Sequence, residues 1–139
     1  MNSDLTRFIE AQKKDYSKAF SEIQTGKKLT HWMWYIFPQI SGLGFSETAK
    51  YYGIKNSEEA IDYFNEEYLG TNLIGITKLL IDLNANNANK IFGYPDDLKL
   101  RSSMTLFYLV SNKNEIFKSI IDKYFNGVFC EKTIQLLNK

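Results

Sequence analysis

Apolar residues recur at helical spacing through most of this sequence, and that spacing restricts the fold more than any other feature. Near the N-terminus, one helical face collects Leu5, Phe8, Ile9, Tyr16, Ala19, Phe20 and Ile23. A period of about 3.6 residues predicts amphipathic helices, and the pattern continues to the end of the chain. We therefore expect an all-α protein, a compact bundle in which residues 1–139 form a single globular domain.

Capping residues and helix breakers divide the pattern into about six to eight helices. Ser3 or Asp4 can cap the first helix, Thr30 a short one over 31–36, and Ser57 another. The asparagine-rich stretch 84–89 is a polar break that a short helix can follow. The segment near 95–110 is apolar on every side, which is typical of a buried central helix, although Leu109 and Val110 would also suit a strand.

Charge and residue counts exclude several classes of protein. Lysine and arginine number 17 against 16 acids, so the chain has no general electrostatic attraction to nucleic acid or anionic membrane. One histidine and one cysteine cannot supply a four-ligand zinc site, although counting alone leaves a carboxylate-only site open. No apolar run resembles a signal peptide or spans a bilayer. We expect a cytoplasmic protein without a metal or cofactor.

An aromatic segment, His31-Trp32-Met33-Trp34-Tyr35-Ile36-Phe37-Pro38-Gln39, precedes the loop Gly42-Leu43-Gly44. In a helix its rings would point in every direction, so the segment should be enclosed, and its indoles and amide need partners. It is either a core cluster with a tight turn or the wall of a pocket for a phosphate or a ring. Under the second interpretation the ligand-binding candidates are His31, Trp32, Trp34, Gln39, Gly42 and Gly44. Gln12, on the apolar face of the first helix, is either a structural anchor or part of a polar site.

The start of the 95–110 helix carries the second candidate segment. Lys99 lies near the positive end of an otherwise apolar helix, where a cation is disfavoured unless an anion offsets it. Asp96 or Asp97 can do so internally, and a ligand phosphate or carboxylate can do so externally. Ser102 and Ser103 would add hydroxyls beside Lys99. A ligand site requires that Trp34, Gln39 and Lys99 converge on one pocket.

In these segments the sequence resembles a bacterial family of domains of unknown function whose members often carry the label calpastatin. The resemblance covers nearly the whole chain and rests on Arg7-Phe8-Ile9-Glu10-Ala11-Gln12, the aromatic segment with its glycine loop, Tyr52-Gly53-Ile54, Glu59-Ala60, Leu69-Gly70, and Phe92-Gly93 through Phe107. It implies a compact helical fold. It also suggests a distant relationship to the NADAR superfamily, which is tied to NAD and ADP-ribose metabolism. Family members often have an arginine where this chain has Asn72, so any anion contact of that arginine is absent here or made by another residue.

Two functional hypotheses follow, and whether the protein is an enzyme stays open. The first is a small enzyme that acts on an NAD- or ADP-ribose-like nucleotide, with Asp96 and Lys99 as catalytic residues and hydrolysis of an N-glycosidic bond as the reaction. The alternative is a non-catalytic module that binds a nucleotide or small anion, or an interaction protein. A purely structural role is a third reading, and it predicts that no pocket lies between the two segments.

Overall fold

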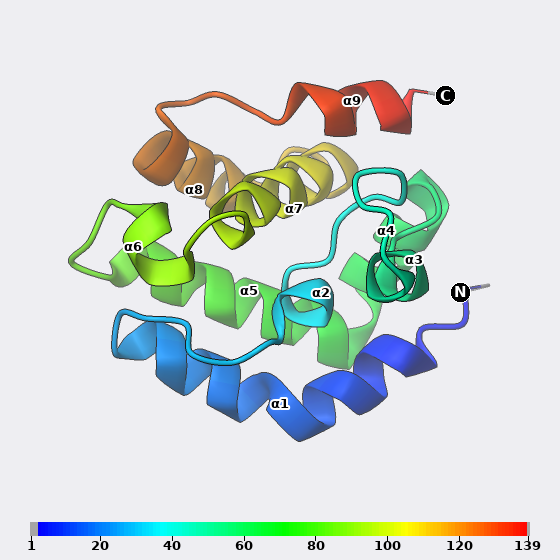
Figure 1. Cartoon of the computed structure of the whole chain (residues 1–139). Helices are drawn as coiled ribbons and strands as arrows, with labels where there is room; N and C mark the ends of the chain where they lie inside the picture. The colour runs from blue at the N-terminus through cyan, green and yellow to red at the C-terminus, as the bar shows by residue number, and fades with distance from the viewer. Residues whose placement is uncertain (1–2, 139) are drawn as a thin grey trace.

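The computed structural model describes residues 3–138 and confirms the all-α prediction (Figure 1). Its helices are α1 (Thr6–Gln24), α2 (Met33–Ile36), α3 (Glu47–Tyr52), α4 (Ser57–Asn65), α5 (Glu67–Asp82), α6 (Ala88–Phe92), α7 (Asp96–Val110), α8 (Glu115–Phe125) and α9 (Glu131–Leu137). The nine helices of residues 3–138 exceed the expected six to eight, because the asparagine-rich break is followed by α6. The only β-type pairing within residues 3–138 is an isolated bridge between Ile40 and Ile54.

Helix α7 is the buried central helix that the sequence predicts. It packs against α4, α6, α8 and α9, while α1 and α5 lie side by side on the other side of the molecule (Figure 1). Residues 102–107 are all buried, whereas Leu98 and Leu109 near its ends are about 40% exposed, at 41% and 38%. Leu109 and Val110 belong to the helix and not to a strand. None of the helices in the described residues has the length and apolarity that a membrane crossing requires.

Several helix starts differ from the expected ones because other side chains cap them. Asn56, and not Ser57, caps α4 by accepting the N–H of Glu59. The expected cap of α2 by Thr30 is wrong: α2 begins at Met33 without a side-chain cap, and the Thr30 hydroxyl donates to Glu22 instead. Leu5 precedes α1, and the Asp4 carboxylate accepts the N–H of Thr6 nearby.

Glu22 is the buried anchor of the loop that leads into the aromatic segment. One oxygen accepts from the N–H of Leu29 (2.7 Å), the N–H of Thr30 (3.0 Å) and the Trp32 indole (2.9 Å), and the other accepts from the Thr30 hydroxyl (2.7 Å). Burial alone would raise the pKa of Glu22, but the hydrogen bonds from Leu29, Thr30 and Trp32 outweigh it and lower the pKa to about 2. The carboxylate therefore holds its charge inside the protein.

Most of the aromatic segment forms core, as the first interpretation predicts. Trp32 and Phe37 are 1% exposed, and both rings meet Phe92 of α6 at close to right angles. Trp34 and Gln39 are only partly buried, and His31 is exposed. The segment therefore divides into a packed part and three residues that reach the surface.

Gln12 is a structural anchor and not part of a surface site. Its amide is buried and donates to the carbonyl of Tyr35 and the hydroxyl of Tyr63, both at 2.7 Å. Its oxygen accepts from the side-chain amide of Asn72 at 3.0 Å. Asn72 thus completes an internal hydrogen-bond network that joins α1, α2, α4 and α5.

Candidate functional site

The two segments singled out in the sequence meet at one pocket of about 280 Å³. Trp34 comes from α2, Gln39 and Gly44 from the loop that follows, and Lys99 and Ser102 from the first turns of α7. The remaining lining residues are apolar: Leu43, Pro95 and Leu98. The convergence of Trp34, Gln39 and Lys99 that a ligand site requires is therefore present. We call this cavity the Trp34–Lys99 pocket.

Lys99 has two partners in this arrangement. Its ammonium lies 3.7 Å from the centre of the Trp34 ring, a cation–π contact. It also lies 3.2 Å from one oxygen of Asp96, whose other oxygen is 2.9 Å from the ammonium of Lys28. Two ammonium groups thus share one carboxylate, so these three groups together carry a net charge of +1.

Asp96 occupies the middle of that row of charges. Each of its oxygens is held by a different lysine, and it does not line the Trp34–Lys99 pocket. The side chain of Lys28 is only 7% exposed, so this lysine is a fixed part of the fold. The geometry gives Asp96 the role of bridging and orienting the two cations.

The other sequence candidates are divided between the pocket and the protein interior. Gly44 and Ser102 line the pocket, and the Ser102 hydroxyl lies 3.2 Å from the carbonyl of Leu98 and 3.3 Å from Sγ of Cys130. Four candidates lie outside the pocket. His31 is exposed, and Gly42 lies next to the Leu136 side chain. Trp32 is buried and donates its indole N–H to Glu22, and Ser103 is fully buried. Core packing explains Trp32 and Ser103, because a ligand cannot reach either residue.

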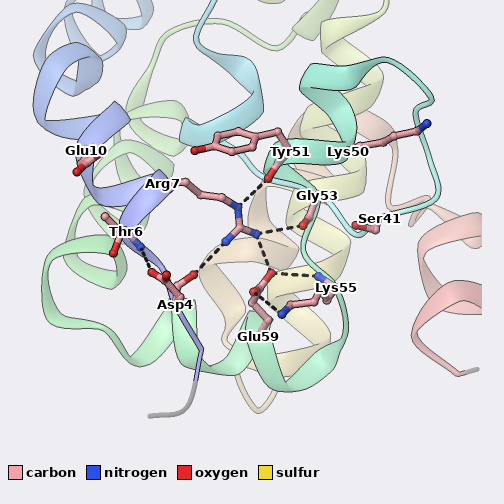
Figure 2. Close-up of a pocket in the computed structure, with 10 residues that line it drawn as sticks. All are labelled: Asp4, Thr6, Arg7, Glu10, Ser41, Lys50, Tyr51, Gly53, Lys55 and Glu59. Carbon is pink, nitrogen blue, oxygen red and sulfur yellow. Dashed lines mark hydrogen bonds and ion pairs between the residues drawn. The ribbon is translucent and has the colours of Figure 1, made fainter.

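A larger pocket of about 550 Å³ lies where the start of α1 meets α3 and α4 (Figure 2). We call it the Arg7–Glu59 pocket; its lining residues are Asp4, Thr6, Arg7, Glu10, Ser41, Lys50, Tyr51, Gly53, Lys55 and Glu59. The Arg7 guanidinium donates to the carbonyls of Asp4 (3.0 Å), Tyr51 (2.7 Å) and Gly53 (3.3 Å). Arg7 therefore ties the start of α1 to the end of α3 at one wall of the cavity.

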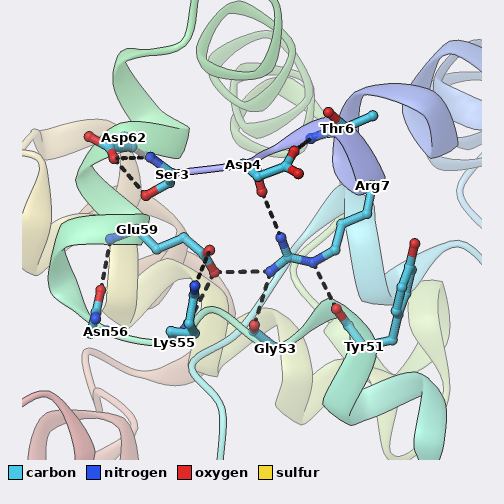
Figure 3. Close-up of polar contacts among 10 residues, drawn as sticks. All are labelled: Ser3, Asp4, Thr6, Arg7, Tyr51, Gly53, Lys55, Asn56, Glu59 and Asp62. Atoms are coloured by element: carbon cyan, nitrogen blue, oxygen red, sulfur yellow. Dashed lines mark hydrogen bonds and ion pairs between the residues drawn. The ribbon is translucent and has the colours of Figure 1, made fainter. Parts of the chain in front are cut away.

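Glu59 is the acidic partner of that clamp (Figure 3). It is 1% exposed, and its Oε1 accepts from Arg7 at 2.9 Å and from the backbone N–H of Lys55 at 3.1 Å. Its Oε2 has no hydrogen-bond partner, and the Lys55 ammonium is 3.9 Å away. A buried carboxylate oxygen without a donor is uncommon in a folded protein.

Sequence reasoning missed Arg7 and Glu59 as a pair. In the sequence, Glu59 stands out only as part of the Glu59-Ala60 motif of the family resemblance. A usable signal was present: Glu59 is followed by Ala60 and lies four residues before Tyr63, both fully buried, so it falls on the inward face of α4. An acid at such a position needs a cationic partner, but the sequence does not say which one.

Comparisons with known proteins agree with this fold. The sequence model of the family described as "Protein of unknown function (DUF1810)" matches residues 2–137. The crystal structure of the conserved hypothetical protein Rv1873 from Mycobacterium tuberculosis superposes with a TM-score of 0.94 at 42% identity, over 98% of this chain and 97% of that chain. No curated protein matches the chain.

Proposed function

The chain belongs to the DUF1810 family, and we propose that its Trp34–Lys99 pocket binds a small nucleotide-derived anion. The observation that carries the proposal is the unbalanced positive charge of Lys99, held beside an aromatic ring at the mouth of a partly apolar cavity. Asp96 offsets only part of that charge because Lys28 shares the same carboxylate. A ligand phosphate would complete the pairing.

The size and walls of the pocket limit which part of a ligand it can hold. A volume of about 280 Å³ is at the small end for ligand sites, so the cavity suits a phosphorylated sugar or one mononucleotide better than a dinucleotide. The Trp34 face beside Lys99 is already covered by the ammonium. The ligand therefore meets that cation first, and its less polar part lies against Leu43 and Leu98.

Binding is better supported than hydrolysis. None of the described residues that line the pocket is a carboxylate or a histidine, the usual groups for general acid–base catalysis. Cleavage of an N-glycosidic bond, the reaction that a distant relationship to the NADAR superfamily would imply, would require Asp96 to leave both of its lysines. We therefore propose a binding module for nucleotide-type ligands, and we test for turnover in the same experiment.

Replacing Lys99 with methionine is expected to weaken AMP binding by about tenfold to a hundredfold, because a charge-assisted hydrogen bond is lost while the apolar stem is kept. Isothermal titration of wild-type and Lys99→Met proteins with AMP measures this difference. Adenosine, which lacks the phosphate, should bind weakly to both proteins. Lys118→Met removes an equal charge from α8, where Lys118 pairs with Asp122, and serves as the matched control.

Equal AMP affinity in the wild-type and Lys99→Met proteins would contradict the proposal, as would the absence of binding to either. Chromatography of the recovered ligand completes the experiment. Unchanged AMP is the expected result, since the proposed module has no acid–base group in its pocket. Free adenine, released together with ribose 5-phosphate when water cleaves the N-glycosidic bond of AMP, would instead favour the enzyme hypothesis.

A further inference from the structure

We propose that the Arg7–Glu59 pocket is a second binding site, and that it takes a small organic cation with N–H donors, of the primary ammonium or guanidinium class. The two pockets share no lining residue among those described, so this proposal does not depend on the function of the Trp34–Lys99 pocket. It rests on one unsatisfied oxygen, one loosely placed lysine and the acceptors around them.

The unsatisfied oxygen is Oε2 of Glu59. Among residues 3–138, five buried side-chain atoms lack a hydrogen-bond partner, and this is the one carboxylate oxygen in that group. The side chain is 2% exposed, and both of its donors, Arg7 and the backbone of Lys55, contact the other oxygen. A charged oxygen taken out of water without a donor is costly, so a donor arriving from the pocket would be strongly favoured.

Lys55 approaches this oxygen without satisfying it. Its ammonium is 3.9 Å from Oε2, too far for a hydrogen bond, and its side chain is 72% exposed. An ion pair this loose and this solvated contributes little to stability. The Lys55 side chain can therefore turn into solvent at small cost and expose Oε2 to a ligand cation that bonds to it directly.

The walls of the pocket favour a cation over an anion. The Arg7 guanidinium uses four hydrogen bonds on Glu59 and on three carbonyls, so its charge is already engaged. The Lys50 and Glu10 side chains both point away from the guanidinium, whereas the Asp4 carboxylate lies close to it (Figure 2). An anion in the pocket would be repelled by the carboxylates of Asp4 and Glu59, and a cation would be attracted by them.

Tyr51 supplies an aromatic face at the rim. The residue is 59% exposed and lines the pocket beside Arg7. A Tyr face attracts an ammonium or guanidinium group through the ring quadrupole. A ligand whose donor reaches Oε2 can thus place its remaining positive surface against Tyr51.

Isothermal titration with agmatine, which carries an ammonium and a guanidinium group, tests the proposal. Glu59→Gln should weaken binding by about tenfold or more, because the amide oxygen keeps the bonds to Arg7 and Lys55 while the amide nitrogen turns a donor toward the ligand. Lys55→Met should tighten binding severalfold, because the competing ammonium is gone. A purely structural Glu59 predicts no change in agmatine affinity for Lys55→Met.

Three further measurements keep the outcome decisive. Butanol, a neutral probe, should not bind, and Lys99→Met should bind agmatine as the wild type does, which separates this site from the other pocket. If Glu59→Gln fails to fold by circular dichroism, Tyr51→Ala replaces it, and it should weaken agmatine binding because the cation–π face is lost. No agmatine binding to wild type or Lys55→Met, or equal affinity across all variants, would overturn the proposal.

Discussion

Replacing Glu22 with alanine is expected to lower the free energy of unfolding by about 4 kcal/mol, a large part of the total for a small domain. The carboxylate accepts four hydrogen bonds from Leu29, Thr30 and Trp32. Its removal leaves three N–H donors without an acceptor, and one of them is the indole of Trp32, which is 1% exposed. Urea unfolding of wild type and Glu22→Ala, followed by circular dichroism, measures the difference.

The same carboxylate predicts a pH dependence. The pKa of Glu22 is lowered from 4.5 to about 2, so between these values the unfolded chain binds more protons than the folded protein. The corresponding stabilisation, up to about 3 kcal/mol, is fully present above pH 4.5 and is lost as the pH falls through 2.

Glu22→Gln is the matched variant that tests this loss of stability at low pH. The amide oxygen can take the place that accepts three N–H groups, and the Thr30 hydroxyl can turn to accept from the amide nitrogen. We expect this variant to be more stable than Glu22→Ala at neutral pH and to lack the Glu22 contribution to acid unfolding. If wild type and Glu22→Gln lose stability in parallel between pH 4.5 and 2, the pH dependence of the free energy of unfolding comes from other groups.

The second large effect is expected for Gly70→Ala, which should cost about 3 kcal/mol. A Cβ at this position would overlap the carbonyl oxygen of Phe64 and lie 3.2 Å from its carbonyl carbon. Those atoms are backbone at the end of α4, which joins α5 through Glu66, so they cannot move aside as a side chain can. The gain in helix propensity from Gly to Ala, about 1 kcal/mol, is too small to compensate.

Gly75→Ala in the same helix is the control. Its Cβ would meet only the Tyr16 hydroxyl, at 3.2 Å, which is the end of a side chain. We expect the helix-propensity gain and this crowding to nearly cancel, so thermal unfolding should change little. Equal destabilisation by Gly70→Ala and Gly75→Ala would show that the close approach of α4 and α5 is not the cause of the effect at residue 70.

The fold was predictable because it depends on the periodic burial of apolar side chains, and most of this chain carries that period. The central position of α7 followed from apolar residues on all its sides. Helix starts were less predictable, because the local sequence offers more suitable capping residues than the helices use. Asn56 and Ser57 both suit the start of α4, and Thr30 suits the start of α2. Thr30 serves Glu22 instead of α2, a choice that the local sequence does not contain.

The two pockets also differ in how far the sequence alone predicts their residues. Trp34, Gln39 and Lys99 stood out because polar or charged residues interrupt apolar segments, and the structure brings them to one cavity. Arg7 and Glu59 did not stand out, because each looks like an ordinary charge on an amphipathic helix. Their partnership spans 52 residues of sequence, so only the packing of α1 against α4 reveals it.

The indole N–H resonances of the two tryptophans test the central proposal most directly, since only Trp34 lines the pocket and Trp32 is buried on Glu22. During titration with AMP, the Trp34 signal, assigned with Trp34→Phe, should shift to saturation, and the Trp32 signal should shift far less. The Lys99→Met protein should need about tenfold to a hundredfold more AMP for the same Trp34 shift. A Trp34 signal that stays fixed at saturating AMP, or that follows the same titration curve in Lys99→Met, would contradict binding at this pocket.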